Sequence, residues 1–228
     1  MRERETLCKI SRMVISIFLP IVVLLSVLQV YAFDKKFYVK EFKKYDITEV
    51  TQIQEPDLAK IAEKLIHYLS GKEDDLEIQI KIKGQRAPVF GEREKQHMID
   101  VKKLFQKGYM LRNTGVIFLT IAVIILFKLS QNMYKDIFKS FFNASVVSLT
   151  VMTILFLLIQ IDFYKYFTYF HEIFFDNDLW LLDPKEDVLI QMLPLEFFID
   201  IAIKVIISFI VIMGGIGGLS FHKLKQIR

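Results

Sequence analysis

The sequence predicts an α-helical membrane protein with four transmembrane helices, a small α+β domain between the first two, and a short helical loop between the last two. The first observation is that 53% of the residues are hydrophobic and gather in long runs. The second is that four runs approach the roughly 20 residues that cross about 30 Å of hydrocarbon. The third is that basic residues collect at one side of these runs, which places both termini in the cytoplasm.

The four runs differ in the charges that they contain. The first and the third contain none. The second reaches full length only if residues 109–112 lie at its outer interface and Lys128 extends its ammonium group to the other interface. The fourth carries three charged residues near its start. The predicted spans are residues 13–33, 113–127, 140–161 and 194–221.

Lysine and arginine determine the orientation, because short cytoplasmic flanks are rich in them. The first span is longer than the roughly 7 to 15 apolar residues of a cleaved signal, so we expect a retained anchor. The predicted division is 1–33 for the cytoplasmic N-terminus and first span, 34–108 for an extracytoplasmic domain, 109–161 for the second and third spans, 162–193 for an extracytoplasmic interfacial loop, and 194–228 for the fourth span and cytoplasmic tail.

Charge and cysteine content exclude several functions. The net charge of +4 follows mainly from the basic cytoplasmic flanks, so nucleic acid is not an expected partner. The single cysteine, Cys8, precedes the first span on the cytoplasmic side. Disulfides and cysteine nucleophiles are therefore excluded from the outer face.

The first outer segment combines a helical pattern with a strand pattern. Apolar residues recur at spacings of three and four between Pro56 and Gly71, which predicts an amphipathic helix that Gly71 ends. Apolar and polar residues then alternate from Asp75 to Lys83, which predicts a half-buried strand ended by Gly84. A lone strand leaves its edges unpaired, so we expect residues 47–53 to pair with it.

Two histidines are candidates for chemistry. His97 lies at the edge of the apolar face of a second predicted helix, a position that is more often structural when taken alone. His171 lies among eight aromatic residues between positions 163 and 175, a composition typical of a membrane interface. Desolvation there favours the neutral imidazole and the neighbouring carboxylates favour the charged one, so His171 is suited to act as a base near neutral pH. We interpret His67, on the amphipathic helix, as structural.

The residues after His171 contain a capping pattern and then a charged helical face. Asp183, Pro184 and Glu186 predict the start of a supporting helix that Pro194 ends. Glu196, Asp200 and Lys204 follow at steps of four on one face of the fourth span. Charges at this depth must face the protein interior, a wet cavity or one another. Two interpretations stay open: an Asp200–Lys204 ion pair, or a polar wall that orients a lipid headgroup or a substrate amine.

Two stretches, FGEREKQHMIDVKKLF from Phe90 and FHEIFFDNDLWLLDPKEDVLIQMLP from Phe170, carry a resemblance together with the four-span layout. The chain resembles the lipoprotein intramolecular transacylases of low-GC Gram-positive bacteria. The resemblance implies an enzyme that moves the sn-2 acyl chain of a diacylglyceryl lipoprotein to the free α-amine of its N-terminal cysteine, giving the lyso-form lipoprotein. It also implies that the catalytic histidine pair falls on His97 and His171.

The residue types suit this chemistry. Aminolysis of an ester requires a neutral amine, a base for its proton and a donor to the departing oxygen, and two histidines can share these tasks. We expect direct transfer with no acyl-enzyme, no cofactor and no metal, by a monomer at the extracytoplasmic face of the cell membrane. The expected partners are the lipoprotein substrate and membrane lipids. The expected substrate-binding residues are Glu92, Arg93, Asp176, Asp178, Trp180, Glu196 and Asp200.

Two other functions remain open from the sequence. A metal-dependent membrane hydrolase would use His97, His171 and carboxylates such as Glu94 as ligands, although the HExxH motif is missing. A non-enzymatic lipid- or lipoprotein-binding protein would use the same aromatic belt and polar face. The catalytic hypothesis requires both imidazoles to border a common cavity, and a separation of ~15 Å would exclude it.

Overall fold

The computed structural model describes residues 2–82 and 85–227. The chain divides into two compact units. The first comprises Met1–Gln29, Gly108–Ile161 and Ile203–Arg228, and the second comprises Val30–Lys107 and Asp162–Ala202.

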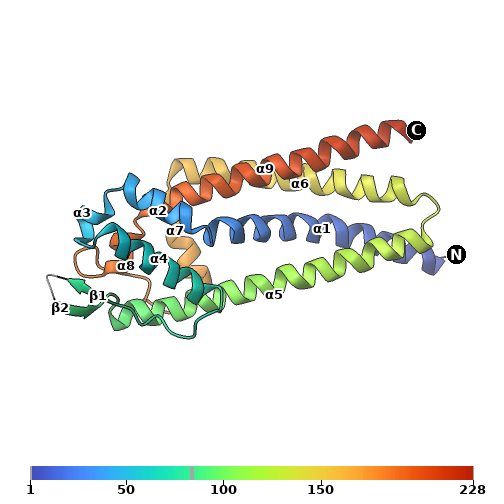
Figure 1. The fold of residues 1–228 in the computed structure, drawn as a ribbon. Helices are drawn as coiled ribbons and strands as arrows, with labels where there is room; N and C mark the ends of the chain where they lie inside the picture. Colours follow the sequence, from blue (N-terminus) through green and yellow to red (C-terminus); the bar gives the residue numbers. More distant parts are fainter. Residues whose placement is uncertain (1, 83–84, 228) are drawn as a thin grey trace. The chain divides into compact units, whose positions relative to one another are not determined.

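The first unit is built from long helices. It contains most of α1 (Arg2–Ala32), the later part of α5 (Glu92–Leu129), all of α6 (Met133–Ile161) and most of α9 (Leu195–Gln226), as Figure 1 shows. Each of these helices is long and apolar enough to cross a membrane. The prediction of four membrane spans is therefore confirmed.

Small residues let the helices of this unit approach closely. A Cβ atom added to Gly115 would lie 2.8 Å from the side chain of Val22, so α5 passes close to α1 at this point. A Cβ atom on Gly217 would lie 2.8 Å from Ser145, which brings α9 equally close to α6. Arg12 on α1 forms an ion pair of 2.7 Å with Asp136 on α6.

The second unit begins with three helices that follow the first span. They are α2 (Lys35–Lys44), α3 (Ile47–Thr51) and α4 (Glu55–Leu69). Asp34 accepts a hydrogen bond from the backbone N–H of Lys36 and caps α2. The helix predicted between Pro56 and Gly71 is confirmed as α4, which Gly71 ends with a φ of 78°, a conformation that glycine adopts without strain.

The two strands of this unit form a hairpin. β1 (Gln79–Ile82) is antiparallel to β2 (Gln85–Pro88), with Gln79 opposite Pro88. The expected pairing with residues 47–53 was wrong, because Ile47–Thr51 forms α3. β2 follows β1 closely in the chain, so pairing the two strands closes a much shorter loop. The strand is also shorter than predicted, and Lys83 and Gly84 lie outside the described residues.

Two helices come from the second segment of this unit. α7 (Phe163–Phe174) is capped by Asp162, whose side chain accepts a hydrogen bond from the backbone N–H of Lys165. α8 (Val188–Met192) is only five residues long. The predicted helix start at Asp183 was wrong: the backbone N–H of Asp187 donates to the Asp183 carbonyl, and the Asp187 side chain accepts from the N–H of Asp183, which closes a turn instead.

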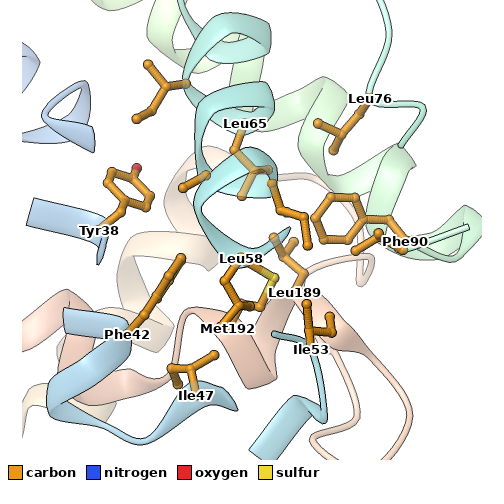
Figure 2. Close-up of a cluster of buried hydrophobic side chains, with 14 of the residues drawn as sticks. Tyr38, Phe42, Ile47, Ile53, Leu58, Leu65, Leu76, Phe90, Leu189 and Met192 are labelled. Atoms are coloured by element: carbon orange, nitrogen blue, oxygen red, sulfur yellow. The ribbon is translucent and has the colours of Figure 1, made fainter. Parts of the chain in front are cut away.

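The core of the second unit draws on both of its segments. Side chains from α2, α3 and α4 pack with Leu189 and Met192 of α8, as Figure 2 shows. Leu189 and Met192 are 4% and 0% exposed, which is the burial expected of central core residues. Residues 30–107 and 162–202 therefore share one apolar core. Phe90, just before α5, and Leu189 of α8 both belong to this core.

Candidate active site

His97 lies in the first turns of α5. It is 8% exposed and its neighbour Met98 is 4% exposed, so the imidazole is buried more deeply than the edge position predicts. It precedes the apolar stretch that begins at residue 113, which is the part of α5 predicted to span the membrane. His97 lies near the start of α5, so the position of its imidazole depends on how the first turns of the helix are held.

His171 lies in the last turn of α7 and is 9% exposed. Its Nδ1 lies 2.7 Å from the backbone carbonyl oxygen of Phe167, one turn earlier. A carbonyl oxygen only accepts hydrogen bonds, so Nδ1 carries the proton and donates it. In the neutral imidazole, Nε2 is then left with a free lone pair that can accept a proton.

The two imidazoles are neighbours. Their ring centroids lie 6.0 Å apart with an angle of 33° between the ring planes. Phe175 packs against both rings, at 5.3 Å from His97 and 5.6 Å from His171. Trp180 stacks on His171 with its centroid at 4.9 Å and an angle of 28°. The separation is far below the ~15 Å that would exclude a shared site.

Burial keeps both imidazoles neutral near pH 7. Burial lowers the pKa of His97 to about 4, with a further lowering from His171 and an opposing effect of the Asp100 carboxylate. Burial also lowers the pKa of His171, and the hydrogen bond to the Phe167 carbonyl opposes this effect. The pair is thus available as a proton acceptor and as an N–H donor under physiological conditions.

The loop after α7 is tied to α5 by polar contacts. The Asn177 side-chain amide donates a 3.0 Å hydrogen bond to the carboxylate of Asp100, one turn after His97. The Arg93 guanidinium donates to the backbone carbonyl of Asp178. These contacts hold the segment that carries Trp180 beside the helix that carries His97.

The structure brings together some of the predicted substrate-binding residues. Trp180 contacts His171 directly, and Arg93 and Asp178 contact each other. Glu92 is exposed and accepts a hydrogen bond of 2.7 Å from the side chain of Gln96. Two further predicted substrate-binding residues have exposed side chains: Asp176 in the loop after α7 and Glu196 at the start of α9.

Asp200 belongs to a separate polar cluster. Its carboxylate accepts a 2.6 Å hydrogen bond from the hydroxyl of Tyr45 and pairs with the ammonium group of Lys44. Glu41 on α2 is 2% exposed, and its pKa is raised by burial and by Asp200, against the effect of Lys44. Asp200 thus has protein partners on and just after α2, whereas Phe198 on the same helix packs against Phe167, 4.8 Å from centroid to centroid.

Several residues of the site were not predicted in the roles that they occupy. Phe175 packs against both imidazoles, Asp100 acts on the charge of His97, and Asn177 binds Asp100. Glu94, which the sequence suggests only as a metal ligand, is bonded to the backbone of Gly91 and Leu189. Helical spacing was the available signal, because Glu94 and Asp100 lie three residues before and after His97. Among residues 2–82 and 85–227, no three histidine, cysteine or acidic side chains are grouped to hold a metal ion.

Comparisons with known proteins show the family and the fold of the chain. The sequence model of a family described as lipoprotein intramolecular transacylase matches residues 13–198. The solved structure of the membrane-integral lipoprotein intramolecular transacylase from Bacillus cereus is similar, with a TM-score of 0.83 and 22% identity over 98% of this chain and 99% of that chain.

Two variants of the Bacillus cereus protein, each with one histidine replaced, are also similar in fold. The arginine variant and the alanine variant both give a TM-score of 0.79 and 22% identity over 100% of this chain, covering 96% and 98% of their own chains. At this identity the likeness shows a shared fold. No curated protein sequence matched the chain.

Proposed function

Because the chain belongs to the lipoprotein intramolecular transacylase family, a family of membrane acyltransferases, we propose that it moves the sn-2 acyl chain of a diacylglyceryl lipoprotein to the α-amine of its N-terminal cysteine, with His97 and His171 as the acid–base pair. The observation that carries this proposal is the pair of buried, neutral imidazoles 6.0 Å apart. Two such groups can serve an amine and an ester that belong to one substrate.

His171 is the better candidate for the base. Its Nδ1–H is committed to the Phe167 carbonyl, so Nε2 can accept the proton that the amine loses as it attacks the ester carbonyl. The same carbonyl stabilises the imidazolium that results, because it accepts a hydrogen bond from the positively charged ring. The aromatic rings around His171 give the neutral starting form that a base requires.

His97 is the candidate for the donor. An N–H of its neutral ring can hydrogen-bond to the oxyanion of the tetrahedral intermediate and then to the departing sn-2 oxygen. When the carbon–oxygen bond breaks, that oxygen takes up the proton that the amine released, passed on from the His171 imidazolium. One N–C bond forms and one C–O bond breaks, and no proton is gained or lost overall.

The apolar surroundings favour aminolysis over hydrolysis. Trp180 stacks on His171 and Phe175 packs against both imidazoles, and such apolar neighbours disfavour water beside the reacting groups. The protein's main contribution is then to hold the amine and the ester of one molecule within reach of each other.

The proposed location of the site is the outer leaflet of the membrane. The positive residues of the sequence place residues 34–108 and 162–193 outside. Support comes from the second unit, in which residues 30–107 and 162–202 share one core and hold both histidines. The exposed aromatic residues of α7, such as Tyr164 and Phe174, suit a headgroup zone in which the glycerol ester lies.

The test is product formation by His97→Ala and His171→Ala in a bacterial host that makes diacylglyceryl lipoproteins but no lyso-form. Transfer within one molecule leaves the mass of the lipopeptide unchanged, so fragment spectra must show whether the amine carries an acyl chain. Each substitution is expected to lower the rate by about 10²- to 10⁴-fold, because a missing acid or base group costs that much.

The matched control is His67→Ala, a substitution of the same type on α4 in the same unit, where His67 lies beside Glu73. It is expected to leave the rate unchanged. Substrate labelled in the sn-2 chain alone should pass its label to the amine without exchange between molecules. Full activity in both site variants, at equal protein level, would refute the assignment of the pair.

A further inference from the structure

Glu94 is a buried carboxylate with two backbone partners. Glu94 is only 2% exposed, and both of its carboxylate oxygens accept hydrogen bonds. Oε2 accepts from the N–H of Gly91 at 2.5 Å, and Oε1 accepts from the N–H of Leu189 at 2.6 Å. Burial raises the pKa of Glu94 and these two bonds oppose the rise. A buried carboxylate of this kind is stable only in the geometry that keeps its bonds.

The two bonds have different purposes. The bond to Gly91 returns to the residue just before α5 and satisfies a free N–H at the helix start, as a glutamate in a capping box does. The bond to Leu189 is not needed for capping. It leaves the helix and reaches the first turn of α8, 95 residues along the chain. Glu94 therefore links two elements that the sequence separates widely.

The linked elements each carry part of the site. His97 lies one turn after Glu94 on α5, on the same side of the helix. α8 follows the loop in which Asn177 binds Asp100 and Trp180 stacks on His171. Two further polar contacts between α5 and this loop involve exposed side chains, Arg93 and Asn177, and exposed polar contacts contribute little. Among the hydrogen bonds that join α5 to the segment after α7 in the described residues, the one from Leu189 to Glu94 is buried, and it adds to the apolar packing of Phe175 on His97.

We propose that Glu94 is a positioning residue for the transfer: its two-sided hydrogen bonding holds the start of α5, and with it His97, in register with the α7–α8 segment that carries His171 and Trp180. This inference rests on the proposed function of the histidine pair. Glu94 itself touches no reacting atom. Its loss displaces His97 relative to His171 while the surface that binds the substrate remains.

The expected signature is a loss of kcat at constant KM. Displacement of a catalytic group by a fraction of an ångström disturbs the reactive geometry, and losses of roughly 10- to 100-fold follow from such displacements. Glu94→Asp separates the two bonds, because the shorter side chain can still cap Gly91 but cannot also reach Leu189. Glu94→Gln keeps the length but replaces one of the two acceptor oxygens by a donor.

The experiment measures initial rates with a synthetic diacylglyceryl lipopeptide and the purified full-length enzyme in lipid nanodiscs. The control is Asp34→Ala, which removes the same type of bond, a carboxylate accepting from a backbone N–H, at the start of α2 in the same unit. Glu94→Asp and Glu94→Gln should each lower kcat per folded enzyme by about 10-fold or more with KM within about twofold. Asp34→Ala should leave both constants at their wild-type values.

Unchanged kcat per folded enzyme in both Glu94 variants, with only the melting temperature lowered, would show a purely structural residue and overturn the proposal. A raised KM with normal kcat would also overturn it, because it would assign Glu94 to substrate binding. If His97→Ala and His171→Ala abolish transfer while Glu94→Asp is normal, only this inference fails. If both histidine variants keep full activity, the proposed function fails, and the inference about Glu94 fails with the proposed function.

Discussion

Two polar clusters in the second unit show opposite ways of placing polar groups in a protein. In the cluster around Asp200 the polar groups pair with one another: Tyr45 and Lys44 both bind the Asp200 carboxylate, and Glu41 lies against it. The pair of His97 and His171 is instead surrounded by aromatic rings, and neither imidazole forms an ion pair with another of the described residues. Both clusters contain residues that the sequence nominated for function.

The two clusters differ in the hydrogen-bonding groups that remain available to a substrate. The Asp200 carboxylate is bound by Tyr45 and Lys44 of the protein itself, which favours a role in joining α9 to α2. At the histidine pair, Nε2 of His171 is free and burial keeps the rings neutral. Uncommitted hydrogen-bonding capacity in a dry setting points to chemistry, and the predictions below test this contrast in order of expected size.

The largest expected effect is the dependence of stability on pH. Burial lowers the pKa of His97 to about 4 in the folded protein, from 6.5 in the unfolded chain. Below pH 6.5 the unfolded chain binds more protons, so stability falls as the pH falls towards 4, and the part due to His97 reaches about 3 kcal/mol. Melting curves of wild type and His97→Gln between pH 7 and pH 4 should show a clearly smaller decrease in the variant. Parallel curves would mean that His97 is not held neutral by burial.

The stacked tryptophan should have the next largest effect. Trp180→Ala removes the ring that packs on His171 at 4.9 Å, and an aromatic contact of this kind contributes about 1 kcal/mol beyond its area. We expect the transfer rate to fall roughly tenfold, and Trp180→Phe to keep most of it. Tyr45→Phe, which removes a hydroxyl from the Asp200 cluster, should leave the rate unchanged. A larger loss in Tyr45→Phe than in Trp180→Ala would reverse the comparison.

The smallest effect concerns Glu41. Its pKa is raised, so the folded protein favours the protonated carboxyl of Glu41. As the pH rises above the ordinary pKa of a glutamate, the unfolded chain loses this proton more readily, and the free energy of unfolding decreases. Glu41→Gln removes this charge and supplies an amide that can donate to Asp200. The expected gain is about 1 kcal/mol, or roughly 2 to 4 °C in the melting temperature, with a normal transfer rate. A decrease of that size would show that the fold requires the charge.

Sequence patterns predicted those features that depend on local chemistry. Long apolar runs gave the four spans, and the spacing between Pro56 and Gly71 gave α4. Residues 47–53 were assigned to a strand because the strand predicted at 75–83 needed a partner, but the side chains of Ile47 and Ile53 belong to the core around α4 and α8. A local pattern cannot show this, because the competing contacts come from distant segments.

The same limit applies to the site. Each histidine could be nominated from its neighbours, and the resemblance of two stretches joined them. The contacts of Glu94 with Leu189 and of Asp100 with Asn177 depend on how α5 lies against the later segment. The turn closed by Asp183 and Asp187 was mistaken for a helix cap, because both begin with an acidic side chain that accepts backbone hydrogen bonds.

The most direct test of the account is whether the two histidines act as one unit. Transfer rates of His97→Ala, His171→Ala and the double variant should be measured at equal protein level with the synthetic lipopeptide. If His171 carries the proton and His97 stabilises the oxygen in the same reaction step, the double variant should be no slower than the slower single variant, because either substitution already breaks the pair. Losses that multiply in the double variant would show two independent residues and contradict the proposed mechanism.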